Sequence, residues 1–382
     1  MGKKRNGIKA ISLVLASILL CGILLSCGTT QNQTVPASET GDGSTLDQNE
    51  LTAPLTTENP SGDSAPDDSK TIDIILVAGQ SNAVGHTRIS DREDAYALAP
   101  ELETGFSNVL ISGDLRYSDV GNPQGFSRRH IYWKKTVLGM GKTGGYMGPE
   151  AGMAIELSKY YNAESGRSVG IIKYGHGGTN LLNVTSGSSQ YGNRVSPSYA
   201  ERKNIPYEGA TGGLYREFIP TVQKMLQSLK SIGYTDFRIL GMYWMQGEND
   251  RNSSTADYKE AFLCFAEDIR SDLSDAVKEI TGNNDRGSAQ MPIWIGTISR
   301  TFYSASEEDI AVNTAFINMQ KGLPNSRNNL IVVDNSVYDM NRIVNGSNVV
   351  VGSDCYHWSQ NDHLMIGRNI GKKIMEYYNL SE

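Results

Sequence analysis

An alternation of short apolar segments with amphipathic segments between residues 71 and 380 constrains the fold of this chain most. Five segments have the length and nearly continuous apolar character of strands that are covered on both faces. They span residues 71–78, 169–174, 238–245, 292–298 and 330–333. Segments with helical periodicity lie between them and after the last one, so the pattern predicts an α/β/α sandwich around a five-stranded parallel sheet.

The expected helices carry recognisable start and stop signals. Pro149 and Glu150 open the first long helix, because proline suits the first helical position and an acidic residue suits the helix N-terminus. Pro220 is expected to kink or shorten the helix over residues 214–230. The other helices are predicted over 258–273, with a cap at 253–255, over 309–321 and over 362–378.

The first 27 residues carry the signals of a secreted lipoprotein. A basic start precedes an apolar run at 11–25, which is too short to span a membrane comfortably and is followed by Ser26 and Cys27. The ending Leu-Leu-Ser-Cys resembles a bacterial lipobox and predicts a signal peptide at 1–26 with a lipid on Cys27. The alternative is an ordinary signal peptide that contains a cysteine.

Residues 27–70 are polar, acidic and free of aromatic side chains, which predicts a disordered tether. A single domain is then left at 71–382. The expected location is extracytoplasmic, with the lipid as the only attachment to the bacterial cell membrane. A Cys27→Ser variant that stays in the membrane fraction would contradict this location.

Charge and cysteine usage narrow the function further. The net charge of −7 over 382 residues is a mild acidic excess, which argues against binding to nucleic acid. Neither a Walker-type loop nor a recognisable metal-binding motif occurs, so no cofactor and no metal are expected. No obligate protein partner is evident. Cys264 and Cys355 could form a disulfide, although nothing in the sequence requires one.

Four polar motifs stand where predicted strands end or the last helix begins, and the first contains a serine. The carboxyl ends of parallel strands meet at one edge of a sheet, where chemistry gathers. The first strand runs into Gly79 and Ser81, and a serine at such an exit can project its hydroxyl from a tight turn. A helix cap or a phosphate-binding turn would use the same residues. The second glycine of the usual nucleophile elbow is absent at Ala83.

The next two strands end in residues that suit an oxyanion site. Gly177 and Gly178 let a backbone amide approach a ligand closely, although they also suit a flexible turn. Gln246 can donate its amide to an oxyanion, and Glu248 can orient an imidazole. A solvated loop is the alternative for this third motif.

The fourth motif pairs an acid with a histidine. Asp354 and His357 can meet across one turn, so that the carboxylate holds the imidazole in one tautomer and orientation. His363 also follows an acidic residue, but it lies within the predicted last helix and is expected to be structural. The other histidines lack such a partner: His86, His130 and His176.

Together these motifs resemble those of the SGNH-hydrolase superfamily, and within it the sialate O-acetylesterase-like and carbohydrate esterase family six group. The matching stretches are Gly-Gln-Ser-Asn at 79–82, Gly-Gly-Thr at 177–179, Trp-x-Gln-Gly-Glu at 244–248 and Asp-x-x-His at 354–357. The resemblance covers nearly all of residues 71–380 and implies a flavodoxin-like fold that needs no cofactor.

The resemblance also implies roles for individual residues. Ser81 would be the nucleophile, His357 the base and Asp354 the acid that orients the base. The implied oxyanion donors are the Ser81 amide, a Gly177 amide and the Gln246 side chain. The role of Glu248 stays open, because members of the group differ over whether this residue supports the histidine. Candidate substrate contacts beside these groups are Asn82, His176 and Gly178.

We therefore expect a serine esterase that removes acetyl groups from carbohydrates through an acetyl-enzyme. A GDSL-type lipase or thioesterase would share the fold but would need an apolar acyl groove, and a catalytically silent glycan-binding surface protein is the second alternative. Polar insertions at 86–145 and 183–213 are expected to contact the sugar. Aromatic residues available there for stacking on sugar rings are Tyr132, Trp133, Tyr146, Tyr191 and Tyr207.

Overall fold

The structure, a computed structural model, describes residues 70–113, 133–182, 192–282, 285, 287–325 and 328–380. Cys27 and the segments around it lie outside these ranges, so the signal peptide, the lipid and the tether stay predictions. Within the described ranges, no helix is long and apolar enough to cross a membrane.

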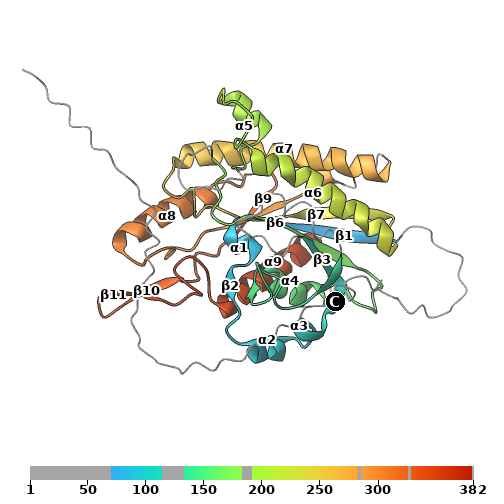
Figure 1. Cartoon of the computed structure of the whole chain (residues 1–382), viewed down its shortest axis with the longest axis horizontal. Coiled ribbons are helices and arrows are strands. Elements are labelled where there is room, and N and C mark those ends of the chain that lie inside the picture. The colour runs from blue at the N-terminus through green and yellow to red at the C-terminus, as the bar shows by residue number, and fades with distance from the viewer. Residues whose placement is uncertain are drawn as a thin grey trace, which may run out of the picture. The chain divides into compact units, whose positions relative to one another are not determined.

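A seven-stranded sheet with the order β4-β3-β6-β1-β7-β8-β9 forms the middle layer (Figure 1). Neighbouring strands run parallel, except that β4 is antiparallel to β3. Five of these strands confirm the predicted segments: β1 (Thr71–Gly79), β6 (Val169–Gly175), β7 (Asp236–Met245), β8 (Ile293–Gly296) and β9 (Leu330–Val333).

The expectation of only five strands was wrong, because β3 (Phe106–Gly113) and β4 (Lys134–Thr136) extend the sheet. Both lie in the insertion at 86–145 that the sequence assigns to a loop. In the strand β3 the polar pair Ser107-Asn108 separates Phe106 from the three consecutive apolar residues Val109 to Ile111. These three are buried, so tertiary packing outweighs a weak local signal.

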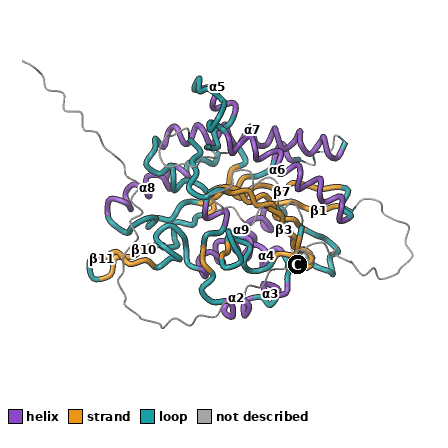
Figure 2. The backbone as a smooth tube through the Cα atoms, viewed as in Figure 1, coloured by secondary structure: helices purple, strands orange, loops and turns teal. Residues whose placement is uncertain are grey.

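Helices cover both faces of the sheet, and Figure 2 shows the strands in one layer with helices on either side. One apolar cluster joins the sheet to α5 (Pro197–Arg202), α6 (Gly213–Leu229), α7 (Thr255–Thr281) and α8 (Glu307–Lys321). The other joins it to α2 (Arg92–Leu98), α3 (Glu101–Thr104), α4 (Glu150–Leu157) and α9 (Gln360–Tyr377). The remaining elements are short: α1 (Ser81–Val84), the pair β2 (Thr87–Arg88) and β5 (Tyr146–Met147), and the pair β10 (Asn341–Val344) and β11 (Ser347–Val350).

The structure confirms the predicted cap of α7 but not the predicted shortening of α6 at Pro220. The Ser254 side chain caps α7 by accepting a hydrogen bond from the Asp257 amide, as the predicted cap requires. The expected shortening at Pro220 was wrong, because α6 continues for 17 residues with this proline inside it. Its apolar face contributes Phe218, Val222 and Leu226 to the core, and this packing holds the helix through the proline.

Close packing of α4 against α9 positions the C-terminal part of the chain. A methyl group added to Gly152 would lie 2.1 Å from the Leu364 carbonyl oxygen, and one added to Gly367 would lie 2.2 Å from the Pro149 carbonyl oxygen. Glycine is therefore required on both helices for the two backbones to approach this closely. The contact holds the start of α9, and with it the loop that carries His357, near the start of α4.

A buried ion pair fixes the segments around the turn after β1. The Lys173 ammonium on β6 lies 2.7 Å from Glu150 Oε2 and donates to the Val84 and Met140 carbonyl oxygens at 2.8 Å each. Both side chains of the pair are fully buried. The Glu150 carboxylate also accepts from the Gly148 amide at 2.9 Å. Because Val84 ends α1, this network ties the first turn after β1 to β6 and α4.

We expect Lys173→Met to lower the free energy of unfolding by about 3–5 kcal/mol, because the Glu150 carboxylate would stay buried without its partner. Adding Glu150→Leu should restore part of this loss by removing the stranded charge. The matched control is Lys278→Met, since Lys278 pairs with Asp275 at the surface and such pairs contribute less than about 1 kcal/mol. Urea unfolding measures all three, and equal losses for the buried and the surface lysine would contradict the expectation.

Candidate active site

The predicted motifs converge because β6 and β7 lie on either side of β1. In the sheet register, Gly79 at the end of β1 is level with Gly175 on one side and Met245 on the other. Backbone hydrogen bonds continue beyond the strands, from the Gln80 amide to the Met245 oxygen at 2.9 Å and from the His176 amide to the Gly79 oxygen at 3.1 Å. The strands of this sheet that follow β1 in the chain lie first on one side of it (β3, β4 and β6) and then on the other (β7, β8 and β9), and such a switch point is where open α/β sheets bind ligands.

Ser81 opens the single turn of α1 directly after this strand end. The turn is held by backbone hydrogen bonds from the Val84 amide to Gln80 and from the Gly85 amide to Ser81, each 2.9 Å long. Ser81 is 8% exposed, at the edge of the buried interior. Because α1 has only four residues, a helix dipole contributes little here, and the individual amides are the groups available to an oxyanion.

Gly177 lies beside Ser81. A methyl group added to Gly177 would be 3.6 Å from Ser81 Cβ and 3.2 Å from His86 Cε1. Gly178 follows with φ of +65°, a left-handed conformation that favours glycine, and it is exposed. The predicted glycine turn is therefore next to the serine, and its second glycine is exposed.

Asp354 and His357 form a hydrogen-bonded pair. Both Asp354 carboxylate oxygens lie 2.8 Å from His357 Nδ1, and Asp354 Oδ1 also accepts from the Tyr356 amide at 2.8 Å. Burial is the largest single influence and raises the pKa of Asp354, but the hydrogen bond and charge of His357, together with the Tyr356 and His357 backbone amides, hold this pKa below its ordinary value. A carboxylate on Nδ1 leaves Nε2 as the ring atom that can accept a proton.

The segment from Asn82 to Arg88 holds the loop of this pair against the serine turn. Asn82 Nδ2 donates to the Tyr356 carbonyl oxygen at 3.4 Å, and Thr87 Oγ1 donates to the Trp358 carbonyl oxygen at 3.1 Å. The Arg88 amide donates to Ser353 Oγ at 2.9 Å. The residues next to Ser81 in sequence are thus bonded to the residues next to His357.

Glu248 is placed behind Asn82 and is bonded to it. Asn82 Nδ2 lies 2.6 Å from Glu248 Oε1, both residues are buried, and burial raises the pKa of Glu248. The carboxylate that contacts the His357 ring is that of Asp354. Glu248 therefore supports the side chain that follows the serine, and Asn82, predicted as a substrate contact, is fully buried.

Gln246 does not have the arrangement expected of an oxyanion donor. Its Nε2 donates to Asp250 Oδ2 at 2.6 Å and to the Thr179 carbonyl oxygen at 3.1 Å, while its Oε1 accepts from Tyr258 at 2.8 Å. Both amide hydrogens are thus used, and the residue is 1% exposed. Gln246 belongs to a buried network beneath the turn, which the buried Arg194 joins through Thr179 and the Gly79 carbonyl.

His86 lies within the site, although it was not among the predicted site residues. Its ring centroid is 5.2 Å from that of His357. Burial and the neighbouring His357 lower the pKa of His86 to about 3, so this ring is neutral near pH 7. The available signal was its position five residues after Ser81, at the end of the turn.

The other histidines occupy different environments. His176 precedes the glycine turn, and burial together with Arg194 lowers its pKa to about 4. His363 is buried in α9 as predicted, with Nδ1 2.7 Å from Thr87 Oγ1. His130 lies outside the described residues.

Three of the five aromatic residues expected to stack on sugars are described, and two of these three pack in or against the core. Trp133 is a core residue whose Nε1 donates to the Met225 carbonyl oxygen at 3.0 Å, and Tyr207 packs against the same core. Tyr146 lies in β5 with the Lys142 ammonium 4.1 Å from its ring centroid. The two remaining ones, Tyr132 and Tyr191, fall outside the described residues.

Two other sequence questions concern metals and cysteines. In the described parts of the chain, no group of three or more His, Cys, Asp or Glu side chains is placed to hold a metal ion. Cys264 and Cys355 are both buried thiols and are not joined in a disulfide.

Comparison with known proteins gives a family and a fold. The model of the family described as "Carbohydrate esterase, sialic acid-specific acetylesterase" matches residues 71–375. No protein of curated function matches the chain by sequence. Among solved structures, NanS is 18% identical with a TM-score of 0.50, covering 81% of this chain and 99% of NanS.

Two further structures match less well in three dimensions. A protein from Arabidopsis thaliana is 16% identical with a TM-score of 0.43, covering 81% of this chain and 99% of that one. A carbohydrate acetylesterase from Sinorhizobium meliloti is 9% identical with a TM-score of 0.38, covering 80% and 99%. At these identities the likeness to NanS concerns the fold, and it agrees with the predicted α/β/α sandwich.

Proposed function

The chain belongs to the sialic acid-specific acetylesterase family of carbohydrate esterases, and on that premise we propose that it removes O-acetyl groups from carbohydrates through an acetyl-enzyme. Membership of this family makes the protein a carboxylic ester hydrolase. The observation that carries the mechanism is the Asp354–His357 pair, which Asn82 holds against the turn of Ser81.

In the first half of the proposed reaction, His357 takes the proton of the Ser81 hydroxyl while the serine oxygen attacks the acetyl carbonyl carbon. The same ring then gives this proton to the sugar oxygen, so that the sugar leaves as a neutral alcohol. Asp354 keeps Nδ1 protonated and stabilises the charged ring. In the second half, water activated by His357 hydrolyses the acetyl-enzyme and releases acetate.

The proposed oxyanion donors are the backbone amides of Ser81 and Gly177. They are supported by the position of Gly177 beside Ser81 and by the open backbone of the glycine turn. Gln246 is left out, because its two amide hydrogens already bind Thr179 and Asp250. We assign it instead to fixing the turn from below. His176 and Gly178 remain proposed substrate contacts at the exposed side of this turn.

The rival function is a lipase or thioesterase of the same superfamily. Such an enzyme would need aliphatic surface beside the nucleophile for a long acyl chain. Gly177, which lies beside Ser81, is also next to the polar ring of His86, and the His86 ring centroid is 5.2 Å from that of His357. This environment suits the small acetyl group and favours the carbohydrate esterase.

We therefore expect kcat/KM to fall steeply with the length of the acyl chain. A site shaped for acetyl should discriminate by roughly 1–3 kcal/mol against the first methylenes that do not fit, or about 10- to 200-fold from acetyl to butyryl. Acetyl, butyryl and octanoyl aryl esters measure this directly. A preference for octanoyl would replace the carbohydrate esterase with a lipase.

The sugar itself is tested by release of acetate. O-acetylated sialic acid is the first substrate to try because the family description names sialic acid, and acetylated xylo-oligosaccharides are the second. Release from either supports the proposal, whereas hydrolysis of aryl acetate without release from any sugar would overturn the carbohydrate part and leave the esterase standing.

We further propose that this reaction takes place outside the cytoplasm, with the domain carried on a lipid at Cys27. The support is the sequence of residues 1–70 alone. Incorporation of a labelled fatty acid that depends on Cys27 is the expected result, and a protein that stays unlabelled would contradict the anchor.

A further inference from the structure

Two exposed tyrosines stand beside the proposed general base. Tyr303 is 46% exposed and Tyr356 is 40% exposed. Their ring centroids lie 5.8 Å apart with planes inclined by 37°, and the Tyr356 centroid is 6.4 Å from that of His357. The two rings come from separate loops, one after β8 and one before α9, and form a shallow aromatic surface next to the site.

The backbone of Tyr303 is held in a conformation that costs energy. Its φ is +72°, in the left-handed region that bulky residues rarely adopt. The Tyr303 amide donates to the Cys355 carbonyl oxygen at 2.8 Å, and this bond ties the loop of one tyrosine to the loop of the other. Strain of this kind persists only where surrounding contacts enforce it, and it gathers at functional sites.

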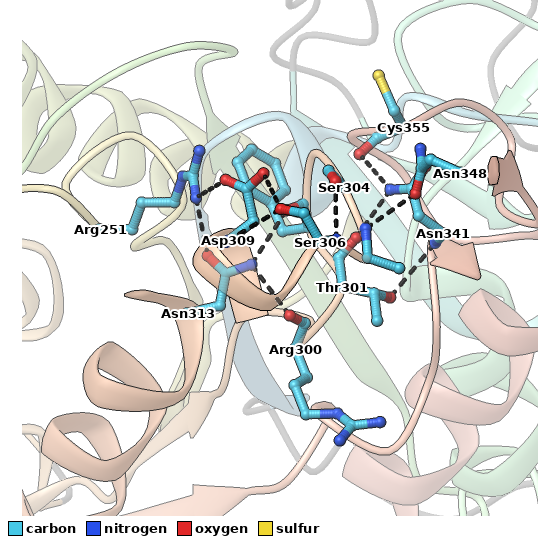
Figure 3. Close-up of polar contacts among 12 residues, drawn as sticks. Arg251, Arg300, Thr301, Ser304, Ser306, Asp309, Asn313, Asn341, Asn348 and Cys355 are labelled. Atoms are coloured by element: carbon cyan, nitrogen blue, oxygen red, sulfur yellow. Dashed lines mark hydrogen bonds and ion pairs between the residues drawn. The ribbon is translucent and has the colours of Figure 1, made fainter. Parts of the chain in front are cut away.

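A polar network supports the strained loop from the protein side. Arg251 Nη1 binds Asp309 at 2.9 Å and Asn313 at 3.1 Å, and Asn313 Nδ2 donates to the carbonyl oxygens of Arg300 and Phe302 at 3.0 Å each (Figure 3). These bonds hold both ends of the segment that leads to Tyr303.

The Arg251 guanidinium also packs against the aromatic rings. It lies 5.3 Å from the Phe302 ring centroid and 5.6 Å from that of Tyr303. The Arg251 side chain is only 12% exposed, so it covers these rings from the interior side. The exposed part of Tyr303 is therefore the part of its ring that Arg251 does not cover.

The chemistry of ester hydrolysis decides which part of the substrate meets this surface. In the tetrahedral intermediate, the former carbonyl oxygen points at the oxyanion donors on Ser81 and Gly177. The leaving oxygen must instead lie near His357 Nε2, because that atom returns the proton to it. The alcohol half of the ester therefore extends from His357, whose ring centroid is 6.4 Å from that of Tyr356.

We propose that Tyr303 and Tyr356 form a stacking surface for the sugar ring from which the acetyl group is removed. This inference rests on the proposed carbohydrate esterase function and deepens it by naming residues that select the alcohol half of the ester. Aromatic side chains combine a large apolar face with few rotatable bonds, so a fixed pair can bind the apolar face of a pyranose at little entropic cost. Binding of a sugar ring would account for the exposure of these two apolar rings beside the site.

The test compares ethyl acetate with acetate esters of a sugar, so that the acetyl group is kept and the alcohol changes. Ethyl acetate is too small to reach the tyrosines, whereas acetylated xylo-oligosaccharides and O-acetylated sialic acid carry a ring. Tyr303→Ala should lower kcat/KM for the ring-bearing substrate by about 5- to 10-fold more than for ethyl acetate, mainly through KM. Tyr356→Ala should show the same selective loss, and Tyr356→Trp should recover most of it.

Tyr377→Ala is the matched control, because it removes an equally exposed tyrosine at the far end of α9. It should leave the ratio of kcat/KM for the sugar ester to kcat/KM for ethyl acetate unchanged.

Stability measurements on position 303 keep the test independent of misfolding. Tyr303→Gly loses the same ring as Tyr303→Ala but relieves the positive φ, so it should be more stable than the alanine variant and equally poor with the sugar substrate. Higher thermal stability together with the selective rise in KM would show that the ring serves binding.

The other outcomes overturn either the stacking surface alone or the carbohydrate function together with it. Equal losses on ethyl acetate and on the sugar would assign the tyrosines to positioning of His357, and unchanged kinetics on both would remove them from the site; either result overturns the stacking surface alone. Hydrolysis of ethyl acetate by the unmodified protein without acetate release from either sugar would overturn the carbohydrate function and the surface together.

Discussion

Ser81→Ala is expected to reduce kcat for an acetyl aryl ester by about four to six decades, as removal of the nucleophile does in other serine hydrolases. The substitution removes one oxygen atom at the edge of the interior. The turn should persist, because α1 is held by backbone hydrogen bonds and by the Lys173 ammonium on the Val84 carbonyl oxygen. Loss of turnover with an unchanged unfolding midpoint would therefore report on chemistry.

A burst experiment adds information about the intermediate. The unmodified protein should release alcohol from an activated acetyl ester before steady state, and Ser81→Ala should show no burst. Ser90→Ala, a serine on the segment that follows the site, is the control and should behave like the unmodified protein. Turnover of Ser81→Ala at the original rate would remove the nucleophile assignment, and a silent unmodified protein would favour the glycan-binding alternative.

The second large effect concerns the acid that serves His357. His357→Ala should be nearly as damaging as Ser81→Ala, and Asp354→Asn can cost up to about four decades, because the neutral amide favours the wrong tautomer of the ring. Steady-state kinetics with an acetyl aryl ester measure both. The hydrogen bonds of Asp354 to His357 Nδ1 are the reason to expect this order.

Glu248→Gln provides the matched comparison, since Glu248 is the other carboxylate near the site. The side-chain oxygen of the introduced amide could still accept from Asn82, so we expect a much smaller loss of kcat than for Asp354→Asn. The reverse order, with Asp354→Asn nearly active and Glu248→Gln inactive, would exchange the two roles. A His363→Ala variant that is inactive beside an active His357→Ala would move the base from the loop to α9.

Periodicity predicted the main elements because a helix that packs on one face repeats apolar residues every three or four positions, and a strand buried on both faces is a continuous apolar run. The sequences of β1, β6, β7, β8 and β9 all show such a run. The strand β3 lacks a clear apolar pattern, since Ser107 and Asn108 separate Phe106 from its three consecutive apolar residues, and only its place between β4 and β6 makes it a strand. Strand ends were also predictable, and the rule that chemistry gathers there selected Ser81, Gly177 and Glu248 from the sequence.

Which of these side chains bind each other was decided by the tertiary structure. Asp354 was the predicted partner of His357 and the role of Glu248 was open in the sequence, and the fold places Glu248 on Asn82 and Asp354 on His357. Gln246 has the residue type of an oxyanion donor, but Asp250 and Thr179 take its hydrogens.

The aromatic surface depends on the fold even more strongly. Tyr303 and Tyr356 are far apart in the chain, and their loops are joined by the bond from the Tyr303 amide to the Cys355 carbonyl oxygen and by Asn341, which donates to the Thr301 and Cys355 carbonyl oxygens. The sequence by itself determined five strands of the sheet, the helices α4, α6, α7, α8 and α9, and the positions where functional groups leave the strands, since these depend on local periodicity and turn residues. The partners of those groups depend on which loops are brought together when α4 packs on α9 at Gly152 and Gly367, and no local pattern records a contact made between segments so distant in the chain.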